Sequence, residues 1–206
     1  MRFSNIEEAA EKVLRDADII KPAVKADRIA EFSYELNLDC IDLDKYCSAG
    51  EVLAAINFVD RTIYLNESRE TEFKNSPGRR NFTIAHELGH WILHKDLAQE
   101  GLPGLDQKKF LLCRGINSRS NDPERQANVF ASCLLMPRSF IEEAMKDFKA
   151  PLTDYDIKQL SDKFCVSKQA MTIRLVDELH ILYDTGGLYY RSNEELLETG
   201  GQLTLF

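Results

Sequence analysis

The chain has 206 residues, 44% of them hydrophobic and 29% charged, which is ordinary for a globular protein and allows either one large domain or a catalytic domain with a small helical module. The formal net charge of −8 argues against nucleic acid as the direct ligand, because binding to phosphates requires positive charge. The sequence turns acidic directly after its start and shows no apolar run that could act as a signal peptide or cross a bilayer, so we expect a cytoplasmic protein without membrane contact.

The first third of the sequence is predicted to be helical on both sides of a break at Lys21-Pro22. Its apolar residues recur at helical spacing, at Ala9, Val13, Leu14 and Ala17 and then at Ile29, Phe32 and Leu36. Residues 51–65 change to a β pattern, in which 52–56 and 62–65 flank the short turn Val59-Asp60-Arg61. This pattern predicts a β-hairpin. We expect its free edge to be able to pair with an extended peptide.

Two amphipathic helices are predicted next, over residues 79–95 and 124–136. The apolar face of the first comprises Phe82, Ala85, Leu88, Trp91 and Ile92, and that of the second comprises Ala127, Phe130, Ala131, Leu134 and Leu135. Pro123 suits the first position of the second helix, and Pro137 ends it.

Residues 155–179 resemble a helix-turn-helix with its turn at Cys165-Val166-Ser167. The remaining segment, 183–206, contains two Gly-Gly pairs. It reads as a loose tail that docks through its aromatic residues.

The segment His86-Glu87-Leu88-Gly89-His90 carries the chemistry of the sequence. Residues four apart share one face of a helix, so His86 and His90 can direct imidazole nitrogens at one metal ion. Glu87 is rotated about 100° from His86, which takes it out of the ligand pair and suits it to act as the general base on an attacking water. The alternative is a pair of buried core histidines. We favour a Zn²⁺ site in which Glu87 is catalytic.

A third protein ligand is needed, because a catalytic zinc ion usually takes three. His94 continues the helix face, but it lies about 12 Å along the axis from His86, too far to share one ion. A metzincin would place its last histidine where this chain has Asp96. His94 is therefore expected to be structural or to contact a ligand.

Glu124 is the preferred third ligand, because it opens a helix after a loop, and Asn128, one turn later, is placed to hydrogen-bond a ligand histidine. The alternative role of Glu124 is a favourable charge in the first turn of a helix. Asp122 and then Asp106 are the other candidate ligands.

Three segments in this order, FTIAHELGH at 82–90, ERQANVFA at 124–131 and LLMP at 134–137, resemble the ImmA/IrrE family of metallo-endopeptidases. The resemblance covers about residues 45–182. It implies that His86, His90 and Glu124 bind zinc and that Glu87 is catalytic. It also implies a protein substrate, a helix-turn-helix transcriptional repressor of a phage, mobile element or stress locus.

The fold class expected from the motif and the elements is α+β and zincin-like, mainly helical with a small antiparallel hairpin or sheet. Residues 1–150 form the predicted metallopeptidase domain, and residues 151–206 form a helix-turn-helix-like module with the tail.

Two other functions compete with a peptidase. One is a DNA-binding regulator, in which the second helix of the module would face a groove through Ser167, Lys168, Gln169, Thr172 and Arg174. Five acidic residues within 152–180 oppose it, because they repel phosphates: Asp154, Asp156, Asp162, Asp177 and Glu178. The other is a zinc-containing regulatory or anti-repressor protein without proteolytic activity.

Two further roles stay open. The five cysteines contain no CxxC pair and are expected to be reduced thiols, and Cys113 is more simply a buried cysteine than a removable ligand on the metal. His180, Arg174 and Tyr183 are each chemically suited to stabilise the oxyanion of the transition state.

Overall fold

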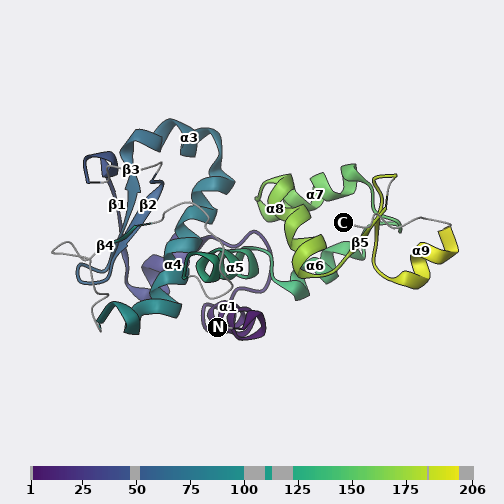
Figure 1. The fold of residues 1–206 in the computed structure, drawn as a ribbon, viewed down its shortest axis with the longest axis horizontal. Coiled ribbons are helices and arrows are strands. Elements are labelled where there is room, and N and C mark those ends of the chain that lie inside the picture. The colour runs from purple at the N-terminus through teal and green to yellow at the C-terminus, as the bar shows by residue number, and fades with distance from the viewer. Residues whose placement is uncertain (1, 47–51, 100–109, 113–122, 185, 200–206) are drawn as a thin grey trace. The chain divides into compact units, whose positions relative to one another are not determined.

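The computed structural model describes residues 2–46, 52–99, 110–112, 123–184 and 186–199 (Figure 1). The contacts divide the chain into two compact units, residues 1–20 with 24–135 and residues 21–23 with 136–206. This division differs from the domain boundary predicted near residue 150, because the helix that follows Pro137 belongs to the second unit. No helix within the described ranges is both long and apolar enough to span a membrane.

The first unit contains five α-helices within the described residues: α1 (Phe3–Asp16), α2 (Ala26–Arg28), α3 (Glu70–Asn75), α4 (Pro77–Gln99) and α5 (Pro123–Leu135). Its strands are β1 (Asn37–Ile41), β2 (Ala54–Asn57), β3 (Thr62–Asn66) and β4 (Phe110–Leu112). The second unit contains α6 (Arg138–Met145), α7 (Asp154–Phe164), α8 (Lys168–Ile173), β5 (Leu182–Tyr183), β6 (Tyr189–Tyr190) and α9 (Asn193–Thr199). Short 3-10 or π-helical segments occur at Ile29–Ser33, Leu43–Lys45, Glu67–Arg69 and Arg174–Glu178. The α+β, mainly helical class is confirmed.

The sheet of the first unit has the strand order β1-β3-β2-β4. The predicted hairpin is present, with β2 antiparallel to β3 and Ala55 opposite Tyr64. The expectation that this hairpin has a free edge was wrong, because β4 pairs with β2 on one side and β1 pairs in parallel with β3 on the other. Within the described residues the outermost strands are therefore β1 and β4.

Strand β1 was missed because its sequence looks unlike a strand. It reads Asn-Leu-Asp-Cys-Ile, and its alternate residues Asn37 and Asp39 are exposed. It is held by pairing with β3, the second strand of the hairpin, which follows it in the sequence only after β2 and the hairpin turn. Such a parallel pairing leaves no local turn signal in the sequence.

Helices α4 and α5 pack against each other, and α5 also packs against α1. The five predicted core residues of α5 are all buried. Helix α4 lies against strand β2, whose Ala54, Ala55 and Ile56 are completely buried. The core of the first unit therefore includes the interface between α4 and this strand.

The second unit contains the predicted helix-turn-helix arrangement of α7 and α8. Thr153 begins α7 with a capping box, because its side chain accepts from Asp156 N and the Asp156 carboxylate accepts from Thr153 N. Cys165 ends α7 with a φ of 55°, and the Ser167 side chain caps α8. The turn therefore combines a left-handed C-cap with a polar N-cap.

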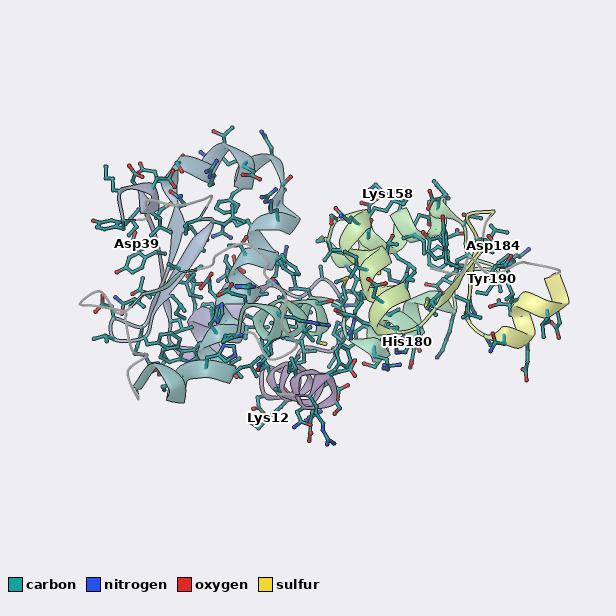
Figure 2. The ribbon with its side chains drawn as sticks, viewed as in Figure 1. Lys12, Asp39, Lys158, His180, Asp184 and Tyr190 are labelled. Carbon is teal, nitrogen blue, oxygen red and sulfur yellow. The ribbon has the colours of Figure 1, made fainter. Side chains whose placement is uncertain are left out.

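The described part of the C-terminal segment is ordered and not a loose tail. Strands β5 and β6 pair, and the rings of Tyr189 and Tyr190 are buried. The Tyr190 hydroxyl donates to Asp184 at 2.7 Å (Figure 2). The buried tyrosine rings agree with the expectation that this segment docks through aromatic residues. The two-stranded sheet of β5 and β6 was not predicted from the sequence.

Candidate metal centre

The two histidines of the motif lie one turn apart on α4, and both are buried. Their Nε2 atoms are 3.0 Å apart. A helical spacing of four residues produces this approach, because side chains at i and i+4 lie above one another on one face.

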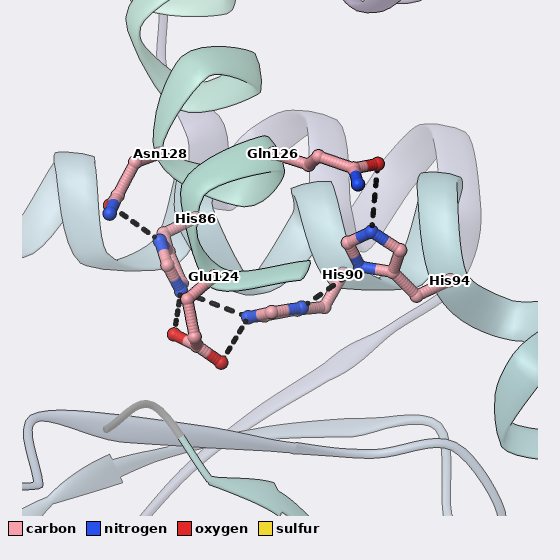
Figure 3. Close-up of polar contacts among 6 residues, drawn as sticks. All are labelled: His86, His90, His94, Glu124, Gln126 and Asn128. Atoms are coloured by element: carbon pink, nitrogen blue, oxygen red, sulfur yellow. Dashed lines mark hydrogen bonds and ion pairs between the residues drawn. The ribbon is translucent and has the colours of Figure 1, made fainter. Parts of the chain in front are cut away.

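Glu124, in the first turn of α5, completes the group. Its Oε2 lies 3.3 Å from His86 Nε2, and its Oε1 lies 3.3 Å from His90 Nε2 (Figure 3). Within the described part of the chain, one group of three His, Cys, Asp or Glu side chains is close enough to share a metal ion, and it consists of His86, His90 and Glu124.

A glycine in the motif permits this arrangement. A Cβ placed on Gly89 would lie 3.0 Å from Phe130 Cδ1 and 3.2 Å from both Cα and O of Ala127. Two helices can approach this closely only where one of them carries no side chain. The crossing of α4 and α5 at Gly89 therefore brings Glu124 over the two histidines.

The three side chains fit a tetrahedral metal ion. Ligand atoms about 2.1 Å from such an ion lie about 3.4 Å from one another. The two Nε2 atoms here are 3.0 Å apart, and each lies 3.3 Å from a different oxygen of the Glu124 carboxylate. Two imidazole nitrogens and one carboxylate oxygen also make up a common ligand set of catalytic zinc, which leaves one position open.

The charges of the group suit a cation. Burial by itself raises the pKa of Glu124, but hydrogen bonds with His86 and His90 outweigh this effect and lower the pKa to about 2. Burial lowers the pKa of His86, but its hydrogen bond with Glu124 and the negative charge of Glu87 outweigh it, so this pKa is raised. Both shifts arise because negative charge on the carboxylates favours positive charge at the imidazoles, and the same attraction favours a bound cation.

Each histidine has a polar partner on its other ring nitrogen. His86 Nδ1 lies 2.9 Å from Asn128 Oδ1, the contact expected from the sequence. His90 Nδ1 lies 3.1 Å from His94 Nδ1, and His94 Nε2 lies 3.5 Å from Gln126 Oε1 (Figure 3). His94 is therefore outside the ligand group, as its axial distance predicted, and contacts a ligand directly.

Gln126 was not singled out from the sequence. It lies two residues after Glu124, out of phase with the face that carries Glu124 and Asn128, so helical periodicity alone assigns it no role. The only sequence signal was its place in the segment ERQANVFA. Its contact with His94 depends on how α5 crosses α4.

Glu87 is completely buried next to the group, on the same helix. It is not one of the three convergent side chains, in agreement with its rotation of about 100° from His86. Its negative charge contributes to the raised pKa of His86. If a metal ion were bound by His86, His90 and Glu124, a buried carboxylate beside them would be suited to exchange protons with a water there.

The other candidates fall into two classes. Asp106, Asp122 and Cys113 lie outside the described residues. Arg174, His180 and Tyr183 lie in the second unit. Arg174 is completely buried there and donates to Met136 O at 3.0 Å and to the Glu178 carboxylate at 2.8 Å.

The comparisons with known proteins bear on both the fold and the site. The family model described as IrrE N-terminal-like domain, Peptidase_M78, matches residues 58–176, which contain α4 and α5. A solved structure titled Mycobacterium tuberculosis transcriptional regulator has a TM-score of 0.52 and 16% sequence identity over 90% of this chain. At this identity the similarity shows the fold alone, and this chain spans 53% of that protein. The comparison with curated proteins found no match.

Proposed function

Because the chain belongs to the peptidase family defined by the IrrE N-terminal-like domain, we propose that it is a zinc-dependent endopeptidase. The observation that supports this proposal most directly is the convergence of His86, His90 and Glu124, in which each Nε2 lies 3.3 Å from an oxygen of the same carboxylate. A metal site that only stabilises the fold usually takes four protein ligands, whereas the three convergent side chains among the described residues would leave a position for the reaction.

Zinc is the metal we propose for this ligand set. Imidazole nitrogens bind zinc well, and one carboxylate oxygen completes the set found in other zinc peptidases. Magnesium and calcium prefer sites built from oxygen ligands, so the two buried histidines disfavour them. When bound, the ion acts as a Lewis acid and lowers the pKa of water to about 7.

Glu87 acts as the general base and then as the general acid. Its carboxylate takes one proton from the attacking water and holds it while the oxygen adds to the peptide carbonyl carbon. The same carboxyl then gives this proton to the departing amine nitrogen as the C–N bond breaks. The proton taken from water has then been passed to the amine, and Glu87 returns to its ionised form. Burial of Glu87 excludes bulk water from this transfer.

We propose a protein substrate that is cut at one or a few bonds, a helix-turn-helix transcriptional repressor. The resemblance of the three sequence segments to the ImmA/IrrE family supports this choice. Since both edges of the predicted hairpin are occupied, the substrate strand would pair with β4, the outer strand beside β2, and no longer with the hairpin itself.

A regulator without peptidase activity is the second candidate, because α7 and α8 form a helix-turn-helix arrangement. Lys168, on the helix that would face DNA, is paired with Asp154 at 2.7 Å. This pairing offsets the positive charge of Lys168 and, together with the other acidic residues of the segment, weakens the case for direct DNA binding. A salt-sensitive gel shift of DNA by the whole chain would support this second function.

The test compares the parent with Glu87→Gln. Both proteins are loaded with Zn²⁺, assayed for bound metal and incubated with purified helix-turn-helix repressors, starting with those whose genes lie nearest to that of this chain. We expect the parent to cut a repressor and Glu87→Gln to be slower by a factor of about 10² to 10⁴ at equal metal content. The matched control is Glu70→Gln, on exposed helix α3, which should cut like the parent. Equal cleavage by Glu87→Gln, or a parent that binds no metal, would contradict the proposal.

A further inference from the structure

His90, His94 and Gln126 form a continuous chain of contacts that leads away from the proposed metal position. Its links are His90 Nδ1 to His94 Nδ1 at 3.1 Å and His94 Nε2 to Gln126 Oε1 at 3.5 Å. All three side chains are buried, with exposed fractions of 0%, 4% and 9%. Bulk water therefore cannot replace any of these partners, and the polar atoms must satisfy one another.

The side chain of Gln126, at the end of this chain of contacts, determines which ring nitrogens of His94 and His90 carry hydrogen. A Gln carbonyl oxygen can only accept, so His94 Nε2 carries the hydrogen. The Nδ1 of a neutral His94 then has a free lone pair and accepts. His90 Nδ1 must consequently be the donor of the 3.1 Å contact. This leaves the lone pair of His90 Nε2 directed toward His86 and Glu124, as a metal ligand requires.

The reverse arrangement is incompatible with metal binding. If the Gln126 amide were turned so that its nitrogen faced His94, His94 Nδ1 would become the donor and His90 Nδ1 the acceptor. A neutral His90 would then carry its hydrogen on Nε2, which would block the ligand position. The orientation of one buried amide thus determines which nitrogen of His90 is available to the ion.

We propose that His94 and Gln126 are positioning residues that hold His90 in the tautomer whose Nε2 binds the metal. Helix α5 then supplies three functions within five residues, since Glu124 is a ligand, Asn128 orients His86 and Gln126 orients His90 through His94. Figure 3 shows the two amides on opposite sides of Glu124. This inference rests on the metal site of the proposed function.

The test measures metal affinity in the full chain and needs no peptidase activity. Metal-free protein is titrated with Zn²⁺ against a chromophoric chelator, and the visible spectrum of the Co²⁺ form reports the ligand geometry. His94→Phe keeps a ring and removes the acceptor, whereas His94→Asn removes the ring and places an oxygen near the position of Nδ1. The matched control is Ile84→Val, a completely buried residue of the same helix, which lowers thermal stability without touching the chain of contacts.

We expect His94→Phe to bind Zn²⁺ about 10- to 100-fold more weakly than the parent and to change the Co²⁺ spectrum. His94→Asn should lie closer to the parent. Gln126→Leu should have the smaller effect, since the 3.5 Å contact is the longer of the two.

The inference is overturned if His94→Phe binds Zn²⁺ within twofold of the parent, if His94→Asn is as weak as His94→Phe, or if Ile84→Val loses as much affinity. A parent that binds Zn²⁺ but cuts no repressor would contradict the proposed function alone, because the affinities still decide the role of His94.

Discussion

Replacing Gly89 with alanine tests whether close contact between α4 and α5 builds the metal site. A Gly to Ala change inside a helix ordinarily stabilises it by about 1 kcal/mol. Here the new Cβ would meet Phe130 Cδ1 at 3.0 Å and the Ala127 backbone at 3.2 Å. Carbon atoms normally pack at about 3.5–4.0 Å, so the helices must separate by roughly 0.5 Å. The Ala127 atoms belong to a helix backbone and cannot rotate away.

Two effects of Gly89→Ala follow from this displacement. Overpacking costs about 1–3 kcal/mol, so after the gain in helix propensity we expect a net loss of up to about 2 kcal/mol in the free energy of unfolding. Metal sites tolerate shifts of only about 0.2 Å in ligand distance, so the affinity for Zn²⁺ should fall at least about 10-fold as Glu124 moves away.

Urea unfolding of the metal-free protein measures the first effect of Gly89→Ala, and competition with a chromophoric chelator measures the second. The control is Gly78→Ala in the first turn of α4, which should be neutral or stabilising and should leave Zn²⁺ binding unchanged. A Gly89→Ala protein that is as stable as the parent and binds Zn²⁺ equally well would refute the reasoning.

Three other predictions concern charge and metal. Removing the metal with a chelator should lower the melting temperature, and stoichiometric Zn²⁺ should restore it. If Zn²⁺ had been present at 1,000 times its dissociation constant, the free energy of unfolding should fall by about 4 kcal/mol. An unchanged melting curve would argue against a metal site that links α4 and α5. In the metal-free protein, the pKa of Glu124 lies below its ordinary value of 4.5, so this carboxylate contributes stability that is present above pH 4.5 and is lost as the pH falls toward about 2. The difference in stability between the parent and Glu124→Gln should therefore shrink over this range in urea titrations at several pH values. Arg174→Leu leaves the largely buried Glu178 without its partner at 2.8 Å and should cost about 3–5 kcal/mol, and a loss below about 1 kcal/mol would show that this pair is not needed for the second unit.

Helix periodicity predicted the elements that carry the site. The apolar spacing of residues 79–95 and 124–136 matches α4 and α5, with ends that differ by a few positions. This succeeds because a buried helix face repeats locally along the chain. The parallel strand β1 and the pairing of β4 with β2 were missed, since both depend on contacts between distant segments.

The sequence by itself determined that His86 and His90 lie together. His86 and His90 must share a helix face whatever the fold around them, because the period of the helix is a local property. It also pointed to Glu124 and Asn128, since these two lie one turn apart at the start of a helix that a proline introduces.

Only the tertiary structure decided how the second helix meets the first. The approach at Gly89 sets the 3.3 Å distances from Glu124 to the histidines and brings Gln126 to His94. No periodicity within either helix contains this information, because the crossing point depends on which side chains of both helices allow their backbones to come close. The same physical reason explains why Gln126 was overlooked in the sequence.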